Sequence, residues 1–168
     1  MFRELNADEI EVRVSRTTSA GVELLLYKTA RTDAAILDET VGHEKWQCDF
    51  KAIDGKLYGG IGIKCGEEWV WKWDAGTEAN MEPTKSEASD AFKRAGFKWG
   101  IGRSLYTAPR IFVYADKCRK LQQGKNGKMQ CYDSFSVAKV AISDGRIKGI
   151  RIVNDSNSGA VVYSWKEG

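Results

Sequence analysis

The sequence lacks several features that would assign it to a common class of enzyme or membrane protein. It contains no run of about 18 apolar residues, so we expect no membrane span. Its first 14 residues are too polar for a signal peptide, which favours a soluble cytoplasmic protein. The P-loop pattern G-x-x-x-x-G-K-[ST] is missing, and this argues against a P-loop ATPase.

Closely spaced metal ligands are also scarce. The sequence contains four cysteines, with no C-x-x-C pair among them: Cys48, Cys65, Cys118 and Cys131. The single histidine, His43, stands in the polar stretch Gly42-His43-Glu44, where we expect a solvent-exposed turn and neither a zinc ligand nor a member of a catalytic triad. The sequence therefore predicts free, mostly buried thiols, and it predicts no metal site, cofactor or catalytic residue.

One short pattern leaves an enzymatic alternative open. Asp49-Phe50-Lys51 contains the [DE]-x-K fragment found in some metal-dependent nucleases. Alternation along a strand places Asp49 and Lys51 together on the polar face of a half-buried strand, where charged pairs are common. A nuclease is therefore the weaker interpretation.

The net charge of +3 hides a strong asymmetry along the chain. Residues 1–92 carry 11 basic and 18 acidic side chains, whereas residues 93–128 carry 10 basic side chains and a single acid, Asp116. The remaining residues, 129–168, carry 5 basic and 4 acidic side chains. A basic block inside a folded domain is typical of proteins that bind a polyanion, although a merely solvated basic face has the same composition.

The apolar periodicity predicts an α+β fold. Its centre is an antiparallel three-stranded meander packed on a following helix, a β-β-β-α core, with an N-terminal hairpin and extra C-terminal strands. We predict one domain over residues 1–168, with a core at about 8–115, a mobile basic loop at about 116–130 and C-terminal strands at about 131–166. The predicted elements are a helical turn after Asn6, strands at 11–16 and 22–28, a helix at 32–40, the meander at 46–73, a helix from Pro83, and strands at 111–114, 135–142, 147–153 and 160–165.

The meander carries an unusual set of glycines and tryptophans. Glycines at positions 59, 60 and 62 indicate the close approach of a helix or a neighbouring backbone. Trp69, Trp71 and Trp73 share one face of the third strand, where they form part of a core or subunit interface, or alternatively a stacking platform for unpaired bases. The acidic neighbours Glu67 and Glu68 would repel phosphate and favour the packing role.

The helix after Pro83 has one apolar stripe, which we expect to face the meander. Its members are spaced at i, i+3, i+4, i+7 and i+11: Ala88, Ala91, Phe92, Ala95 and Trp99. Lys93, Arg94 and Lys98 lie off this stripe, so we expect them to point outward or along the flank of the helix.

The run ASDAFKRAGFKWGIGRSLYTAP, residues 88–109, resembles the signature of phage single-strand annealing proteins related to the eukaryotic recombination mediator Rad52. Upstream, YKTARTDAAILDETVGHEKW at 27–46 resembles the helix that precedes the first meander strand in that family. The resemblance implies a β-β-β-α core that assembles into rings or filaments, with single-stranded DNA held by its backbone in a basic outer groove. Lys93 and Arg94 match the lysine-arginine pair of the groove, and Arg31 matches an arginine of its other wall.

Two further residues, Lys98 and Arg103, join the predicted DNA-binding set on charge and helical position alone. The resemblance implies a non-enzymatic homo-oligomer that anneals complementary strands without ATP in the cytoplasm of a bacterial host, with a phage exonuclease as a candidate partner. Eukaryotic members carry a lysine at a hairpin tip where this chain has Glu67-Glu68, so a second DNA site is not expected there. Other interpretations are a passive single-strand-binding module and a structural oligomer whose basic helix binds an acidic protein.

Overall fold

The computed structural model describes residues 2–77 and 83–168, with the side chains of 83–85 excepted. The chain forms two compact units. The meander unit comprises Met1–Glu4 and Lys28–Gly102, and the sheet unit comprises Leu5–Tyr27 and Arg103–Gly168. The single domain expected from the sequence stays a prediction. No helix in the described part of the chain is long and apolar enough to cross a membrane.

The meander unit contains α1 (Ala30–Val41), the strands β3 (Trp46–Ile53), β4 (Lys56–Cys65) and β5 (Glu68–Ala75), and α2 (Pro83–Trp99). The three strands form an antiparallel sheet in sequence order. Asp54 and Gly55, both at positive φ, make the tight turn between β3 and β4. This arrangement confirms the predicted α+β class and the meander followed by a helix.

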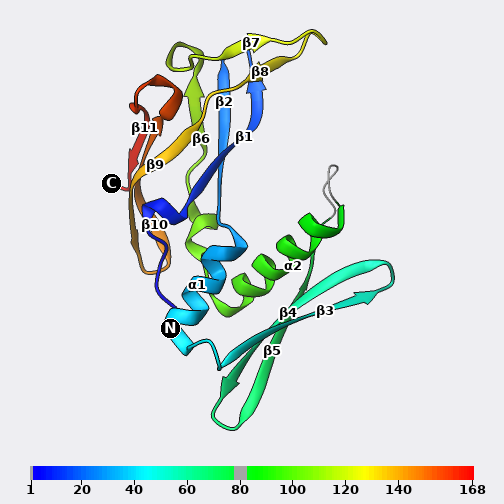
Figure 1. Cartoon of the computed structure of the whole chain (residues 1–168). Coiled ribbons are helices and arrows are strands. Elements are labelled where there is room, and N and C mark those ends of the chain that lie inside the picture. The colour runs from blue at the N-terminus through cyan, green and yellow to red at the C-terminus, as the bar shows by residue number, and fades with distance from the viewer. Residues whose placement is uncertain (1, 78–82) are drawn as a thin grey trace. The chain divides into compact units, whose positions relative to one another are not determined.

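One face of the meander packs against α2 (Figure 1). Ile61 and Ile63 on β4 are buried there, as are Ala91 and Ala95 of the predicted helical stripe. A Cβ atom added at Gly59 would lie 3.0 Å from the Ala91 Cβ, so this glycine permits the close contact of strand and helix. The close approach predicted from the meander glycines is confirmed at this position.

The opposite face of the meander carries the tryptophans. Cross-strand pairing places Trp73 beside Gly60 and Trp71 beside Gly62. A Cβ atom at Gly60 would lie 2.5 Å from the Trp73 ring, and one at Gly62 would lie 2.6 Å from the Trp71 ring. The two rings stack on each other at 5.4 Å between centroids, so they cover the glycine backbone of β4 directly.

The sheet unit is built on one six-stranded antiparallel sheet with the order β11-β10-β9-β1-β2-β6. Its strands are β1 (Glu11–Thr18), β2 (Gly21–Tyr27), β6 (Ile111–Tyr114), β9 (Phe135–Ser143), β10 (Arg146–Asn154) and β11 (Ala160–Lys166). The unit also contains four 3-10 turns: η1 (Ala7–Glu9), η2 (Arg103–Thr107), η3 (Ala115–Lys117) and η4 (Asp155–Asn157). The pairing of Glu11 with Ser136 joins the N-terminal hairpin to the C-terminal strands. The N-terminal hairpin and the meander belong to different units of the chain, and the predicted core at about 8–115 stays a prediction.

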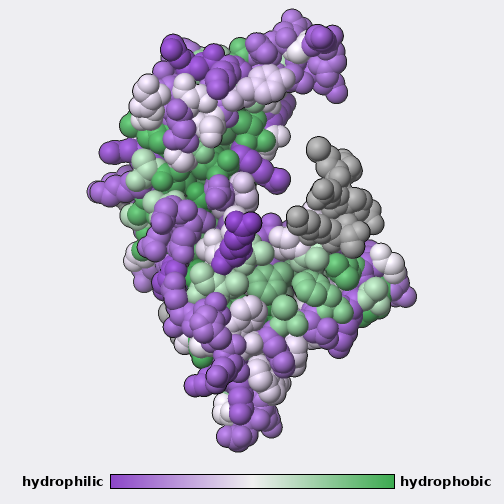
Figure 2. Space-filling view, viewed as in Figure 1, coloured by the Kyte–Doolittle hydropathy of each residue, from purple (hydrophilic) through white to green (hydrophobic). Residues whose placement is uncertain are grey.

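The segment 116–130, predicted to be a mobile basic loop, contains a small antiparallel hairpin of β7 (Leu121–Gln123) and β8 (Met129–Cys131), and its mobility stays a prediction. The two strands lie side by side in Figure 1, and Figure 2 shows a hydrophilic surface over their tip. Lys125 and Lys128, both exposed, lie in the connecting turn.

The prediction of mostly buried thiols is also wrong. Cys48 and Cys65 are exposed on the meander, and Cys118 and Cys131 are only half-buried. The exposed side chain expected for His43 is confirmed: it is 83% accessible and its Nδ1 lies 2.9 Å from the Asp38 carboxylate.

Candidate nucleic-acid interface

The basic side chains of α2 lie on its accessible side. Arg94 and Lys98 are exposed and Lys93 is half-buried, whereas Ala91 and Ala95 of the same helix are buried. The helical period of 3.6 residues separates the two sets, which confirms the prediction that the cations lie off the apolar stripe.

Two carboxylates lie within reach of these cations. The Arg94 Nη2 atom is 3.4 Å from Asp74 Oδ1, and the Lys98 Nζ atom is 3.7 Å from Asp74 Oδ2. The Lys93 Nζ atom is 4.0 Å from Asp90, one helical turn away, while Asp90 also accepts hydrogen bonds from Thr77. Such long, partly exposed ion pairs are weak, about 0–1 kcal/mol each, so a phosphate group can compete for the cations.

A buried ion pair supports the helix beneath these cations. Lys28 and Asp33 are 7% and 0% exposed, and the Lys28 Nζ atom donates a hydrogen bond to Asp33 Oδ1 at 2.6 Å. The same Nζ atom donates to the main-chain carbonyl oxygen of Lys93 at 3.3 Å. Gly96 makes room for the pair, because a Cβ atom there would collide with the Asp33 carboxylate. The pair therefore links the start of α1 to the turn of α2 that bears Lys93.

Burial disfavours both charges of this pair. It raises the pKa of the Asp33 carboxyl to about 6, against the opposing effect of the Lys28 charge. Burial likewise lowers the pKa of the Lys28 ammonium group. The nearby charge of Lys93 is a smaller cause that lowers both pKa values.

Sequence reasoning missed Lys28 and Asp33. A signal for Asp33 was available, since Asp33, Ile36 and Leu37 follow the i, i+3, i+4 spacing of a buried helical face. A carboxylate on such a face requires a buried partner. Lys28, placed just before the N-cap Thr29, gave no comparable signal.

The other two predicted DNA-binding residues lie on different elements. Arg31 is exposed in the first turn of α1, and α1 packs against α2 within the meander unit. Arg103 is exposed at the start of η2 in the sheet unit. Four of the five predicted residues thus belong to the meander unit: Arg31, Lys93, Arg94 and Lys98.

Cationic side chains also contact the aromatic rings of the meander. The Lys51 Nζ atom lies 4.3 Å from the ring centroid of Trp73, and the Lys72 Nζ atom lies 4.3 Å from that of Trp99. Lys51 is thus engaged with an aromatic ring, and Asp49 accepts a hydrogen bond from the Phe50 backbone at 2.8 Å. Among the residues that the structure describes, the one group of three candidate metal ligands does not include Asp49, so the nuclease alternative gains no support.

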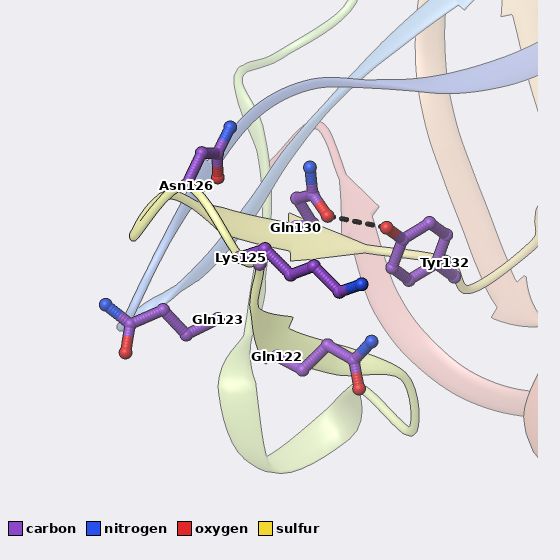
Figure 3. A pocket seen from close by; sticks show the side chains of 7 residues that line it. Gln122, Gln123, Lys125, Asn126, Gln130 and Tyr132 are labelled. Carbon is purple, nitrogen blue, oxygen red and sulfur yellow. Dashed lines mark hydrogen bonds between the residues drawn. The ribbon is translucent and has the colours of Figure 1, made fainter.

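A polar cavity of about 470 Å³ lies on the β7–β8 hairpin of the sheet unit (Figure 3). The Tyr132 hydroxyl donates to Gln130 Oε1 at one side of it. The side chains around it are amides, a lysine and a tyrosine: Gln122, Gln123, Lys125, Asn126, Gln130 and Tyr132. Amide groups and a lysine can bind polar or anionic groups, and they offer no nucleophile with an adjacent base.

Residues 54–123 match the family described as "Rad52/22 family double-strand break repair protein". This segment is Rad52/22-like. It contains β4, β5 and α2, and with them the candidate residues Lys93, Arg94 and Lys98, as well as Arg103. Searches of curated proteins and of solved structures gave no match. The resemblance to Rad52-like annealing proteins is thereby confirmed, and Arg31 lies outside the Rad52/22-like segment.

Proposed function

We propose that the protein binds single-stranded DNA and anneals complementary strands during homologous recombination and repair, without ATP and without a catalytic residue. The observation that carries this proposal is the position of Lys93, Arg94 and Lys98 on the accessible side of a helix that lies inside the Rad52/22-like segment. A homo-oligomeric ring or filament, a phage origin and a partner exonuclease belong to the same proposal.

The basic side of α2 suits the physical requirements of strand annealing. Annealing requires phosphate neutralisation along each strand, because two complementary polyanions repel each other. Lysine and arginine supply that neutralisation through backbone contacts and leave the bases free to pair. Base pairing itself provides the driving force, so the protein needs no chemical step. One chain of 168 residues can hold only a few nucleotides, so a continuous groove requires several copies.

Binding is tested with a labelled single-stranded oligonucleotide over a range of salt concentrations. We expect Lys93→Ala/Arg94→Ala to weaken binding to all sequences and to flatten the salt dependence by about 0.7 in log–log slope for each phosphate that the variant no longer neutralises. The control Arg151→Ala/Lys166→Ala removes the same charge from exposed positions on β10 and β11. Equal losses of affinity in both variants would show a non-specific charge effect and would contradict the assignment of α2.

The closest alternative is a passive single-strand-binding module that coats DNA and does not anneal it. Both proteins would show the same salt-dependent affinity. They differ when complementary strands are coated before mixing, because only an annealing protein accelerates pairing from that state. A structural oligomer that binds an acidic protein would show no salt-sensitive affinity for oligonucleotides.

A further inference from the structure

The base of the β7–β8 hairpin holds two thiols and a buried carboxylate in one cluster. Cys118 follows η3, Cys131 ends β8, and Asp133 comes two residues later. Both Sγ atoms and a carboxylate oxygen of Asp133 lie within 4.8 Å of one another. The hairpin brings Cys118 close to Cys131 and Asp133, which lie 13 and 15 positions later in the sequence, because Leu121 pairs with Cys131.

Asp133 has an unusual environment for a carboxylate. Its side chain is 9% exposed, and its Oδ1 atom is buried without a hydrogen-bond partner. The Oδ2 atom accepts hydrogen bonds from the backbone N–H groups of Arg119 at 2.8 Å and Lys120 at 3.2 Å. A buried carboxylate oxygen without a partner is costly, and a bound cation would compensate for it.

The two thiols make only weak hydrogen bonds. The Cys118 thiol donates to the Tyr114 carbonyl oxygen at 3.6 Å. Three groups that would each carry a negative charge therefore stand together and oppose each other's ionisation. A divalent cation reverses this effect, since it binds the deprotonated form of each group.

We propose that Cys118, Cys131 and Asp133 form a three-ligand site for a thiophilic divalent cation, of which Zn²⁺ is the best match. Thiolates favour zinc among the common divalent ions, and tetrahedral bonds of about 2.0–2.3 Å to sulfur and oxygen place the ligand atoms about 3.5–3.8 Å apart. The Cys131 Sγ atom already lies 3.6 Å from Asp133 Oδ2, to which its thiol donates a hydrogen bond that the bound ion would replace. Three protein ligands leave a fourth position for water. The bound ion would link the two ends of the β7–β8 hairpin, whose turn carries Lys125 and Lys128, to each other.

The test uses the reduced full-length chain and two probes, Co²⁺ alone and Zn²⁺ alone. We expect one Co²⁺ per chain with a thiolate-to-metal charge-transfer absorption, displaced by Zn²⁺. Zn²⁺ should protect Cys118 and Cys131 from alkylation while Cys48 and Cys65, both exposed on the meander, stay reactive. Cys118→Ser, Cys131→Ser or Asp133→Asn should each lower the affinity by at least about tenfold. The matched controls Cys48→Ser and Cys65→Ser should leave it unchanged.

Three outcomes would overturn the proposal. The first is the absence of thiolate–metal absorption in reduced protein whose circular dichroism is that of the folded chain. The second is protection or metal binding that depends on Cys48 or Cys65. The third is a Cys118–Cys131 disulfide that forms in air while the reduced pair binds neither ion, which would assign the two thiols to redox chemistry. If a variant fails to fold, alkylation of the wild-type chain with and without Zn²⁺ still tests whether the ion protects Cys118 and Cys131.

Discussion

The Lys28 Nζ atom donates a hydrogen bond to the Lys93 carbonyl oxygen at 3.3 Å, so a buried ammonium group holds the backbone of a residue for which we propose a role in DNA binding. Lys28 is held in turn by Asp33, and both side chains lie inside the meander unit. The exposed cations of α2 thus lie on a helix that a buried ion pair holds in position. A rigid support of this kind keeps a binding side chain in place.

Loss of one partner of the buried pair should destabilise the protein strongly. Asp33→Ala leaves the Lys28 ammonium group buried without a counterion, and we expect the free energy of unfolding to fall by about 3–5 kcal/mol. The double variant Lys28→Met/Asp33→Leu removes both charges and keeps the volume, so it should recover most of this loss. Urea denaturation of the three proteins measures the difference. A double variant no more stable than Asp33→Ala would show that the pair contributes through more than charge compensation.

The raised pKa of Asp33 gives stability a defined pH dependence. Its pKa of about 6 in the folded state exceeds the ordinary value of 3.8, so between these pH values the folded state binds the proton more tightly than the unfolded state. The stabilising contribution is complete below about pH 4 and is lost as the pH rises through 6. The free energy of unfolding of the wild type, relative to Lys28→Met/Asp33→Leu, should fall from pH 4 to 6 by at most about 1.4 kcal/mol per pH unit. An increase over that range would show that Lys28 lowers the Asp33 pKa more than burial raises it.

Asp74 should act as an internal competitor of phosphate. Its carboxylate lies 3.4 Å from Arg94 and 3.7 Å from Lys98. Asp74→Asn removes the charge and keeps an oxygen, and we expect about fivefold tighter binding of single-stranded DNA at low salt, which corresponds to about 1 kcal/mol. The control Asp144→Asn removes an acid from the β9–β10 turn of the sheet unit. Unchanged affinity in Asp74→Asn, measured by fluorescence anisotropy, would place the bound DNA away from Arg94 and Lys98.

The glycine of β4 beneath the Trp73 ring should not tolerate a side chain. A Cβ atom at Gly60 would lie 2.5 Å from the ring, so Gly60→Ala forces the tryptophan to move, and we expect a loss of about 1–3 kcal/mol in the free energy of unfolding. Gly149→Ala is the matched control on strand β10, because its nearest contact would be an ordinary 3.5 Å. Thermal unfolding of both variants tests the packing. Equal stability of the two would mean that the Trp73 ring does not rest on β4.

Local patterns in the sequence predicted most elements of the fold. Apolar and polar residues alternate on either side of Asp54-Gly55, and apolar residues form the helical stripe that includes Ala91. Both patterns depend only on residues that are close in the sequence. The pairing of Glu11 with Ser136 spans 125 positions, and no local pattern encodes such a contact. The β7–β8 hairpin was missed because its strands have only three residues each, which is too short for a recognisable alternation of apolar and polar residues.

Part of the candidate site was also predictable from a local pattern in the sequence. Lys93, Arg94 and Lys98 could be placed on the accessible side of α2 from the helical period alone. The carboxylate near two of them, Asp74, comes from a different strand, and its distance to Arg94 depends on how α2 packs on the meander. The cluster of Cys118, Cys131 and Asp133 likewise depends on a hairpin that the sequence did not predict.

The most direct test of the proposed function is the rate at which two complementary labelled oligonucleotides anneal, without nucleotide or metal, after each has been coated with protein. We expect wild type to accelerate annealing, Lys93→Ala/Arg94→Ala to lose the acceleration, and Arg151→Ala/Lys166→Ala to keep it. Tight binding by wild type with no acceleration would contradict annealing and would identify a passive single-strand-binding protein.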